Sequence, residues 1–548
     1  MRRTKIIATL GPAVENYETM RRLIKAGCDV ARLNVAHGTV ESHRRLKETF
    51  LKAAKDENKV VGVMMDIKGP EIRVKTTKLS SLAPGTEILL GEGGDIELNQ
   101  PVVYEYLSIG TKVLIHDGDI VLETVGESKG LWRMRVVRGG VIKPRMGVNV
   151  PDTYIPIPYI QSRDLHFIKS IPDIDFIAAS FVRNARDVCE LRKVLKELSI
   201  DAQIISKIEN RDGVKNIESI LEVSDGIMVA RGDLGTEIPV ENLPGVQKYL
   251  LKKAREHGKP GIIATQILET MIHNPYPTRA EVSDIANAIL DGADALMLSG
   301  ETAIGKYPVE AVEVLSKVAE KADVLLSEHE KMLELRGTIS ESVSNAAVLL
   351  AKEINADALL ILTRSGKTAR LISRHRPNMP IFAVSYSREV LRKMTLYWGV
   401  QGFEVERFEY ADRSVKEAID TVEKHGFVKK GDVLVIAGGE PSGIPGTTNF
   451  VWVQIVGDVI ARGSGFGKKI VSGEVCCYPE LCDIVIVSEL CDEMDFGDAK
   501  AIIVESRIYD PDKLNELAAK GKSIVAGTGK IKIEGKITVD PERGVIWH

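Results

Sequence analysis

Pairs of charged or hydroxyl-bearing residues directly follow a series of short apolar runs in this chain. Several pairs are spaced i, i+2, which places both side chains on the same face of a strand. A single pair is typical of a solvated strand end, but seven strands in series with polar ends predict one catalytic mouth that carries both carboxylates and cations. The residues are Arg32 and Asn34, Asp66 and Lys68, Ser180, Lys207 and Glu209, Arg231 and Asp233, Thr265 and Gln266, and Ser299 and Glu301.

Eight apolar runs of strand length must position these residues, and amphipathic segments of helix length separate most of them. This alternation predicts a closed parallel (β/α)8 TIM barrel, in which the active site gathers at the carboxyl ends of the strands. The predicted strands are residues 6–10, 30–35, 60–67, 176–181, 203–208, 226–229, 261–265 and 295–298.

One connection in the predicted barrel is far too long for a single helix. The segment between Asp66 and Phe176 alternates apolar and polar residues and contains many glycine turns. We therefore expect an inserted all-β domain, and its place in a βα loop predicts a lid over the active-site mouth.

Bulk composition narrows the class of protein. The chain has 548 residues, which suggests three or four domains, and its net charge of -4 gives no reason to expect nucleic-acid or membrane-surface binding. No apolar run approaches the ~20 residues that span a bilayer, and the amino terminus lacks the apolar core of a signal peptide. Six cysteines in so long a chain do not suggest a disulfide framework. We expect a cytoplasmic location.

Eight motifs along the chain resemble, in order, those of the pyruvate kinase family, which transfers a phosphoryl group from phosphoenolpyruvate to ADP to give pyruvate and ATP. One Gly-rich motif would be weak support, whereas eight long ones in order are specific. The motifs are IATLGP (7–12), ARLNVAHG (31–38), MDIKGPEIR (65–73), SKIEN (206–210), MVARGDLG (228–235), ATQILETM (264–271), PTRAEVSD (277–284) and LSGETA (298–303).

The resemblance implies a metal and phosphoryl site. Glu209 and Asp233 match the family's ligands for a divalent metal, Mg2+ or Mn2+. Lys207 matches the lysine that faces the transferring phosphoryl group, and Arg32 matches the arginine that binds the substrate phosphate. A fixed cation at this place lowers the barrier because charge spreads over the phosphoryl oxygens.

The resemblance also implies contacts for the rest of both substrates. Nucleotide contacts fall on Asn34, His37 and Arg73. Thr265 and the backbone at Gly232 would hold the substrate carboxylate, next to Asp233, Lys207 and Arg32.

Protonation of the enolate completes the reaction, and three hydroxyl or carboxyl groups lie at suitable strand ends for a relay through water. They are Thr265, Ser299 and Glu301, and the sequence leaves open which one delivers the proton. Lys207 is a poor candidate if it stays charged against phosphate.

The monovalent-cation site departs from the family pattern. Asn34, Asp66 and the carbonyl of Ile67 match K+ ligands, but Ala36 stands where the family has a serine. Glu71 matches the potassium-dependent members. We expect K+ dependence with a weakened site.

A further α/β domain is predicted after the barrel, and its first strand leads into a loop that resembles the effector-phosphate loop of allosteric pyruvate kinases. Backbone amides, hydroxyls and a lysine there could hold phosphate, although an ordinary capped βα turn has the same spacing. The loop residues are Thr363, Ser365, Gly366, Lys367 and Thr368. Residues 438–449 resemble the partner loop, so we expect a phosphorylated effector and, as is usual in the family, a homotetramer.

The last residues exceed the common family length and resemble a shortened swivelling domain of phosphoenolpyruvate synthases. No histidine occurs between His425 and His548, so a phosphohistidine relay is not expected. Four cysteines lie here, and their spacing favours buried thiols over a zinc site. They are Cys476, Cys477, Cys482 and Cys491.

These expectations divide the chain into a barrel (1–70 and 159–337), a lid (71–158), a regulatory domain (338–464) and a swivelling-like domain (465–548). Two alternatives remain from the sequence. One is a metal-dependent lyase or aldolase of the phosphoenolpyruvate/pyruvate barrel class, and the other is a catalytically silent metabolite sensor.

Overall fold

The computed structural model describes residues 2–116, 118–151, 153, 155–326, 337–406, 411–439, 448–457, 459–531, 533 and 535–547, with the side chains of 411–414 outside the description. Contacts divide the chain into two compact units. The first comprises residues 1–336, 364–378 and 387–404, and the second comprises residues 337–363, 379–386 and 405–548.

A closed barrel of eight parallel strands forms the centre of the first unit and confirms the predicted fold class. Each predicted apolar run forms one strand, because a strand buried on both faces needs a continuous apolar sequence. The strands, in chain order, are β1 (Lys5–Thr9), β2 (Val30–Asn34), β3 (Gly62–Ile67), β13 (Phe176–Ala179), β14 (Gln203–Ile208), β15 (Gly226–Ala230), β16 (Gly261–Ala264) and β17 (Ala295–Leu298).

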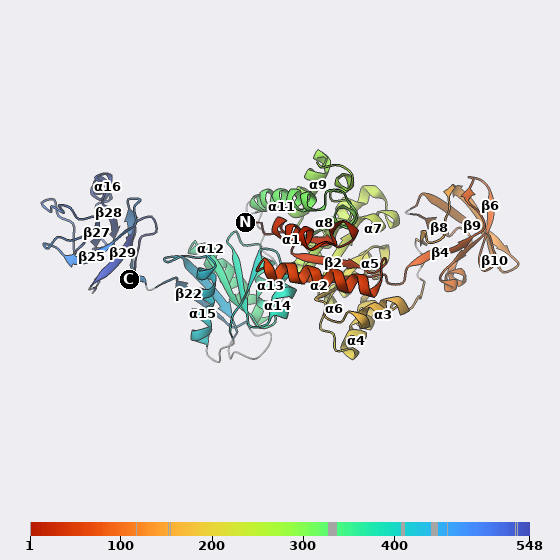
Figure 1. Ribbon diagram of the computed structural model, residues 1–548, viewed down its shortest axis with the longest axis horizontal. Coiled ribbons are helices and arrows are strands. Elements are labelled where there is room, and N and C mark those ends of the chain that lie inside the picture. Colours follow the sequence, from red (N-terminus) through yellow and green to blue (C-terminus); the bar gives the residue numbers. More distant parts are fainter. Residues whose placement is uncertain are drawn as a thin grey trace. The chain divides into compact units, whose positions relative to one another are not determined.

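Helices surround these strands (Figure 1), and most of them bury an apolar face against the barrel. In α2, for example, Leu46, Phe50 and Ala53 recur at helical spacing and are buried, while the Thr39 hydroxyl caps the first turn. The helices are α1 (Tyr17–Ala26), α2 (Val40–Asp56), α3 (Ser162–Ser170), α4 (Ala185–Glu197), α5 (Arg211–Lys215), α6 (Ile217–Val223), α7 (Arg231–Glu237), α8 (Leu243–Glu256), α9 (Arg279–Leu290), α10 (Gly300–Ala303) and α11 (Pro308–Leu325).

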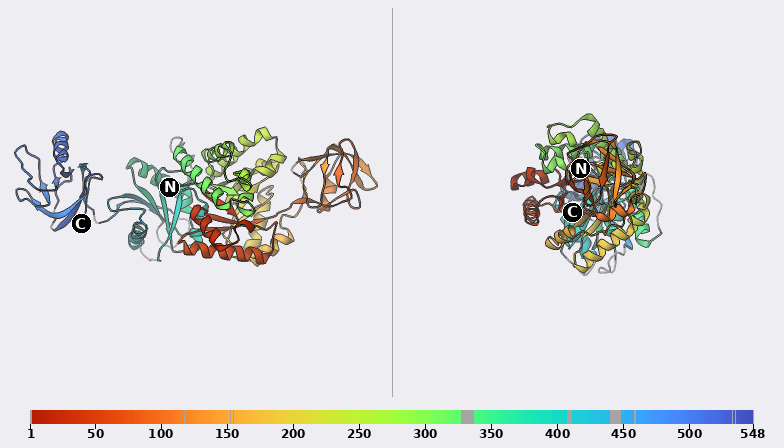
Figure 2. Two further views of the ribbon diagram at one scale, coloured as in Figure 1. Left: turned by 45° about the horizontal axis from the view of Figure 1, so that its top comes forward. Right: turned by 90° about the vertical axis from the view of Figure 1, so that its right-hand side faces the viewer.

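The predicted all-β insertion is a second closed barrel, drawn in orange in Figure 2, with strand order β10-β6-β7-β4-β12-β8-β9. Alternate residues of its strands point inward and form a separate apolar core that includes Val74, Leu122 and Met134. The strands are β4 (Ile72–Thr77), β6 (Glu87–Leu90), β7 (Ile96–Leu98), β8 (Lys112–Ile115), β9 (Ile120–Ser128), β10 (Leu131–Arg138) and β12 (Gly147–Asn149), with β5 (Ser81–Leu82) and β11 (Gly140–Val141) paired beside them.

The predicted α/β domain contains the strands β19-β18-β21-β22 in that order, with β22 antiparallel to its neighbour. These elements are α12 (Ile339–Glu353), β18 (Ala358–Leu362), β19 (Ile381–Ser385), α15 (Ala411–Lys424), β21 (Val433–Gly438) and β22 (Phe450–Ile455). The intervening α13 (Lys367–Ser373), α14 (Arg388–Lys393) and β20 (Val400–Glu404) belong to the first unit.

The tail folds as a sheet of order β23-β30-β29-β25-β26-β27-β28-β24, drawn in blue in Figure 2. Its buried residues form two apolar clusters, one of which includes Leu514 of the single described helix of this tail. The elements are β23 (Val459–Arg462), β24 (Ser464–Phe466), β25 (Val471–Cys477), β26 (Ile484–Val487), β27 (Ala501–Val504), α16 (Pro511–Ala519), β28 (Ser523–Ala526), β29 (Lys536–Asp540) and β30 (Val545–Trp547).

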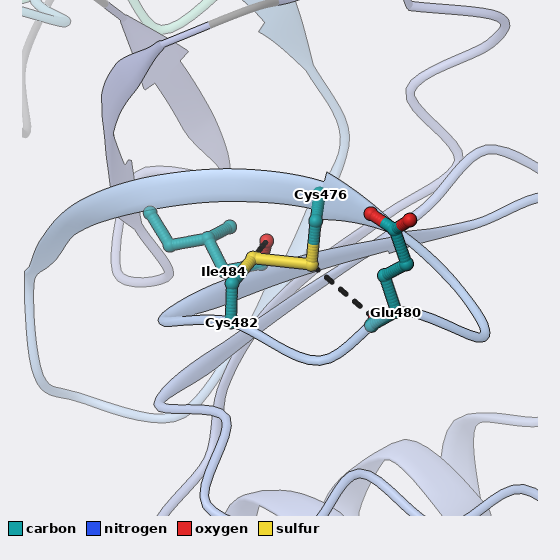
Figure 3. The surroundings of a disulfide bond; sticks show 4 residues. All are labelled: Cys476, Glu480, Cys482 and Ile484. Carbon is teal, nitrogen blue, oxygen red and sulfur yellow. Dashed lines mark hydrogen bonds between the residues drawn. A yellow bond between two sulfur atoms is a disulfide. The ribbon is translucent and has the colours of Figure 1, made fainter.

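The prediction of buried thiols in this tail is wrong. Cys476 and Cys482 form a disulfide (Figure 3), and Cys477 and Cys491 are exposed. The prediction considered only the spacing of the cysteines along the sequence, which does not suit a zinc site, and the alternation of side chains along a strand. It missed that the short β25–β26 connection returns the chain on itself and brings the two Cα atoms to 6.1 Å, within the range of a disulfide. Among the described residues, no group of three or more His, Cys, Asp or Glu could hold a metal.

No helix in the described part of the chain is both long and apolar enough to cross a membrane.

Candidate active site

Lys207 lies at the centre of the polar cluster at the carboxyl ends of the barrel strands. Its ammonium contacts the Glu209 carboxylate at 2.9 Å, the Ser180 hydroxyl at 2.8 Å and the Asp66 carboxylate at 3.3 Å. Burial alone would lower the pKa of Lys207, but the Asp66 and Glu209 carboxylates outweigh it and raise the pKa above its ordinary value. Lys207 is therefore a permanent cation.

Asp66 joins this lysine to the predicted phosphate arginine. Its second oxygen accepts from Nε of Arg32 at 2.7 Å, and Arg32 also donates to the Thr9 hydroxyl at 2.9 Å. Burial alone would raise the pKa of Asp66. The charges of Lys207 and Arg32 lower it by more than burial raises it, so the pKa lies below its ordinary value. The result is a buried carboxylate that holds two cations in fixed orientation.

Glu209 and Asp233 are the two predicted metal ligands. Glu209 directly follows β14, and Asp233 lies in the first turn of α7, which follows the neighbouring strand β15. One Glu209 oxygen accepts from the Phe181 backbone N–H at 2.7 Å, which orients the buried carboxylate. Asp233 lies close enough to Lys207 to raise its pKa. Two carboxylates near a phosphate site suit Mg2+, which usually takes one or two carboxylates and completes its shell with water and substrate oxygens.

The three candidates for the proton relay differ in their surroundings. Both Glu301 oxygens are occupied by backbone N–H groups, of Ser299 at 2.7 Å and of Leu268 at 3.1 Å. Thr265 has a left-handed φ of 67°, and its hydroxyl accepts from the Gly232 N–H at 2.9 Å while it donates to the Ala264 carbonyl. In the described residues, the buried Ser299 hydroxyl has no hydrogen-bond partner.

A cleft of about 930 Å³ between the lid and the barrel contains Asp233 and Arg73. The Arg73 guanidinium contacts the Glu71 carboxylate and the Arg145 carbonyl. His37, predicted as a nucleotide contact, is exposed and does not line this cleft. The cleft thus brings together one metal ligand and one predicted nucleotide contact, whereas the other two predicted contacts, Asn34 and His37, do not line it.

The predicted K+ ligands lie at neighbouring strand ends, since Asn34 and Asp66 are register partners of β2 and β3. The Asn34 side-chain oxygen accepts from the Ala36 N–H at 3.2 Å, and the Ala36 side chain supplies no oxygen. Three of the family's four oxygen donors, counting the Ile67 carbonyl, are therefore present.

The predicted effector loop connects β18 to α13. Gly366 adopts a left-handed φ of 78° and precedes Lys367 and the buried Thr368 at the start of α13. The Thr363 N–H donates to the Val384 carbonyl at 3.1 Å, and Ser365 lies between them in the loop. Residues 440–447 of the predicted partner loop lie outside the described residues.

Sequence reasoning missed the turn that follows β13. Ser180 was assigned only to a strand end, and Phe181 and Arg183 received no role. Phe181 has a left-handed φ of 54°, which is unusual for an aromatic residue and could not be read from its type.

Comparisons with known proteins agree with the motif order. A family model described as the pyruvate kinase barrel domain matches residues 1–312, and one described as the pyruvate kinase alpha/beta domain matches residues 341–454. The pyruvate kinase of Staphylococcus epidermidis is 39% identical over 586 aligned residues, covering 100% of this chain and 99% of that protein. The pyruvate kinase of Geobacillus stearothermophilus is 42% identical over 493 residues, covering 86% of this chain and 84% of that protein.

The crystal structure of a pyruvate kinase from Cryptosporidium parvum superposes with a TM-score of 0.77 at 34% identity, covering 83% of this chain and 96% of that one. Neither family match extends beyond residue 454, whereas the Staphylococcus alignment also covers the tail. The likeness of this tail to a swivelling domain stays a prediction.

Proposed function

Because the chain belongs to the pyruvate kinase family, whose enzymes carry the number EC 2.7.1.40, we propose that the Lys207 cluster is where phosphoenolpyruvate gives up its phosphoryl group to ADP. The observation that carries this assignment is the buried ammonium of Lys207 between two carboxylates, beside Arg32. The family assignment also favours phosphoryl transfer over the lyase and sensor alternatives.

In the proposed reaction, the bond between phosphorus and the enol oxygen breaks as a terminal oxygen of ADP bonds to phosphorus. Negative charge spreads over the phosphoryl oxygens, and the fixed charges of Lys207 and Arg32 stabilise it without reorganisation. Lys207 is a poor proton donor, because the neighbouring carboxylates of Asp66 and Glu209 raise its pKa above the ordinary value. Thr265 and the Gly232 N–H, which already contact one another, would orient the substrate carboxylate.

Glu209 and Asp233 would hold Mg2+ or Mn2+, which supplies charge neutralisation at the substrate oxygens. The chain offers these two carboxylates and leaves the remaining positions of an octahedral shell to water and substrate. Arg73 in the cleft, together with Asn34 and His37, would contact the nucleotide.

The enolate left by phosphoryl transfer takes a proton at its methylene carbon to give pyruvate. Of the three candidates, Ser299 is favoured, because its buried hydroxyl has no hydrogen-bond partner in the described residues, whereas the backbone occupies both Glu301 oxygens. Thr265 is the second choice, because its hydroxyl already accepts a hydrogen bond from the Gly232 N–H.

A lactate-dehydrogenase-coupled assay with and without Mg2+ and K+ tests the function. We expect pyruvate formation that requires ADP and Mg2+ and that rises when K+ replaces Na+. The K+ stimulation should need a high concentration, because Ala36 leaves the site one oxygen short. Equal rates in Na+ and K+ would contradict the proposed K+ dependence. Pyruvate release without ADP consumption would contradict the proposed kinase activity itself.

Regulation by a phosphorylated metabolite at the Thr363–Thr368 loop is also proposed, in a homotetramer. An effector that does not contact the reacting atoms acts by favouring one arrangement of the protein, so it should shift the phosphoenolpyruvate saturation curve leftward. Lys367→Glu should abolish the shift and keep saturated turnover, because it places negative charge where phosphate would bind. Initial rates with sugar phosphates, AMP and phosphoglycerate test this, with the exposed Lys424→Glu as control. Equal activation of wild type and Lys367→Glu would move the effector site elsewhere.

A cytoplasmic location stays a prediction from the sequence.

A further inference from the structure

Two linkers connect the lid to the barrel, and both meet the same turn of the barrel. The outgoing linker is residues 68–71 after β3, and the return linker is residues 155–161 before α3. The turn is residues 180–183, which connect β13 to α4 and which we call the β13 turn. No function assigned above uses the outer side of this turn.

The inner side of the β13 turn holds the reacting groups. The Ser180 hydroxyl accepts from the Lys207 ammonium at 2.8 Å and donates to Asp66 at 3.2 Å. The Phe181 N–H donates to Glu209 at 2.7 Å, and Phe181 itself has a left-handed φ of 54°. A small displacement of the turn would therefore move both Lys207 and Glu209.

The outer side of the β13 turn holds the return linker. The buried Tyr159 hydroxyl donates to the Ser180 carbonyl at 3.0 Å. The Arg183 guanidinium donates to the carbonyls of Ile155 at 2.8 Å and Ile157 at 3.0 Å, while the Asp187 carboxylate orients it at 2.8 Å.

The outgoing linker is held by one carboxylate of α3. Asp164 is 0% exposed, and its two oxygens accept from the N–H groups of Lys68 and Gly69, each at 2.9 Å. This pins Gly69 so close to the turn that a Cβ atom there would lie 2.4 Å from the Ser180 carbonyl oxygen. Gly69 also has a φ of 65°, so both conformation and contact require glycine.

We infer that Asp164, Tyr159 and Arg183 are positioning residues that transmit the position of the lid through the β13 turn to Lys207 and Glu209. The inference rests on the proposed function and on the lid predicted from the sequence, which we expect to close over bound nucleotide and exclude water. In the closed state, the linkers press on the turn from outside and set the distance of the ammonium from the phosphoryl group. A misplacement of the order of 1 Å can reduce turnover by about a hundredfold.

Asp164→Asn tests this transmission, because a carboxamide can accept from only one of the two N–H groups. We expect kcat to fall about tenfold or more, with the KM for phosphoenolpyruvate changed less than about threefold. Hydrogen exchange at Lys68 and Gly69 should accelerate, and phosphate release from phosphoenolpyruvate without ADP should rise, since a loosened lid admits water. Tyr159→Phe removes one hydroxyl only and should lower kcat in the same direction, so it replaces Asp164→Asn if that variant does not fold.

Asp175→Asn is the matched control. Asp175 is also a buried carboxylate, but it accepts from the Val63 N–H at 2.9 Å at the opposite end of the barrel. The Asp175→Asn substitution should lower the Tm of the protein and leave its kcat within about twofold of the wild-type value. The inference is overturned if Asp164→Asn and Tyr159→Phe keep wild-type kcat, or if Asp175→Asn loses kcat to the same extent.

Small-angle scattering of the wild type with Mg2+, ADP and oxalate, which resembles the enolate, separates the two levels of the proposal. Compaction supports a closing lid. An absence of compaction would rule out lid closure. In that case, hydrogen exchange at Lys68 and Gly69 and the kcat of Asp164→Asn would still decide whether Asp164 positions Lys207.

Discussion

Lys207→Met should reduce kcat by about three orders of magnitude while leaving the KM for phosphoenolpyruvate within a few-fold. The ammonium is fixed by Asp66, Ser180 and Glu209, so its charge is already in place when phosphoryl charge develops. Methionine is unbranched and only one atom shorter, so the substitution removes mainly the charge and its hydrogen bonds. Steady-state kinetics with saturating ADP and Mg2+ measure the loss.

The loss in Lys207→Met should also be the same from about pH 6 to pH 8. The pKa of Lys207 is raised and that of Asp66 is lowered, so neither group changes charge in this interval. Lys47→Met is the control, because Lys47 is also buried and paired, with Asp173 at 2.5 Å, but it lies on α2. A fall of less than tenfold in Lys207→Met, or an equal fall in Lys47→Met, would contradict the role assigned to Lys207.

Glu209→Gln should raise the Mg2+ concentration needed for half-maximal activity by at least about tenfold. The carboxamide can still accept from the Phe181 N–H, so the fold should persist while one anionic oxygen ligand is lost. Lys207 would also lose a counter-charge, which adds a decrease in kcat at saturating Mg2+. Activity measured across Mg2+ and Mn2+ titrations separates the two effects.

Asp225→Asn is the comparison for this metal titration. Asp225 also accepts a backbone N–H, from Ile204 at 2.9 Å, but it precedes β15 and so lies at the amino end of the barrel. Its titration midpoint should match the wild type. An unchanged midpoint of the Mg2+ titration in Glu209→Gln would show that Glu209 is not a metal ligand.

The barrel and most of its mouth could be predicted because their determinants are local in sequence. Each strand is a continuous apolar run, and i, i+2 spacing places Lys207 and Glu209 on one face at the end of β14. The same reasoning could not find Asp164, which lies on a helix and acts through backbone N–H groups that every residue type carries. It also could not find the Phe181 conformation or the Cys476–Cys482 disulfide, because both depend on how the chain turns between strands.

The pairing of β3 with β13 has a consequence for how the chain folds. Met64 and Phe176 are register partners, so this pairing joins segments on either side of the whole lid. A contact of such long sequence separation is slow to form, because the intervening chain must be closed into a loop. The lid has its own apolar core and can fold before the barrel closes. Once the lid is folded, only the two linkers remain as flexible chain between β3 and β13. Mutations in the lid core, such as truncation of Met134, should therefore slow the assembly of a barrel that they never touch.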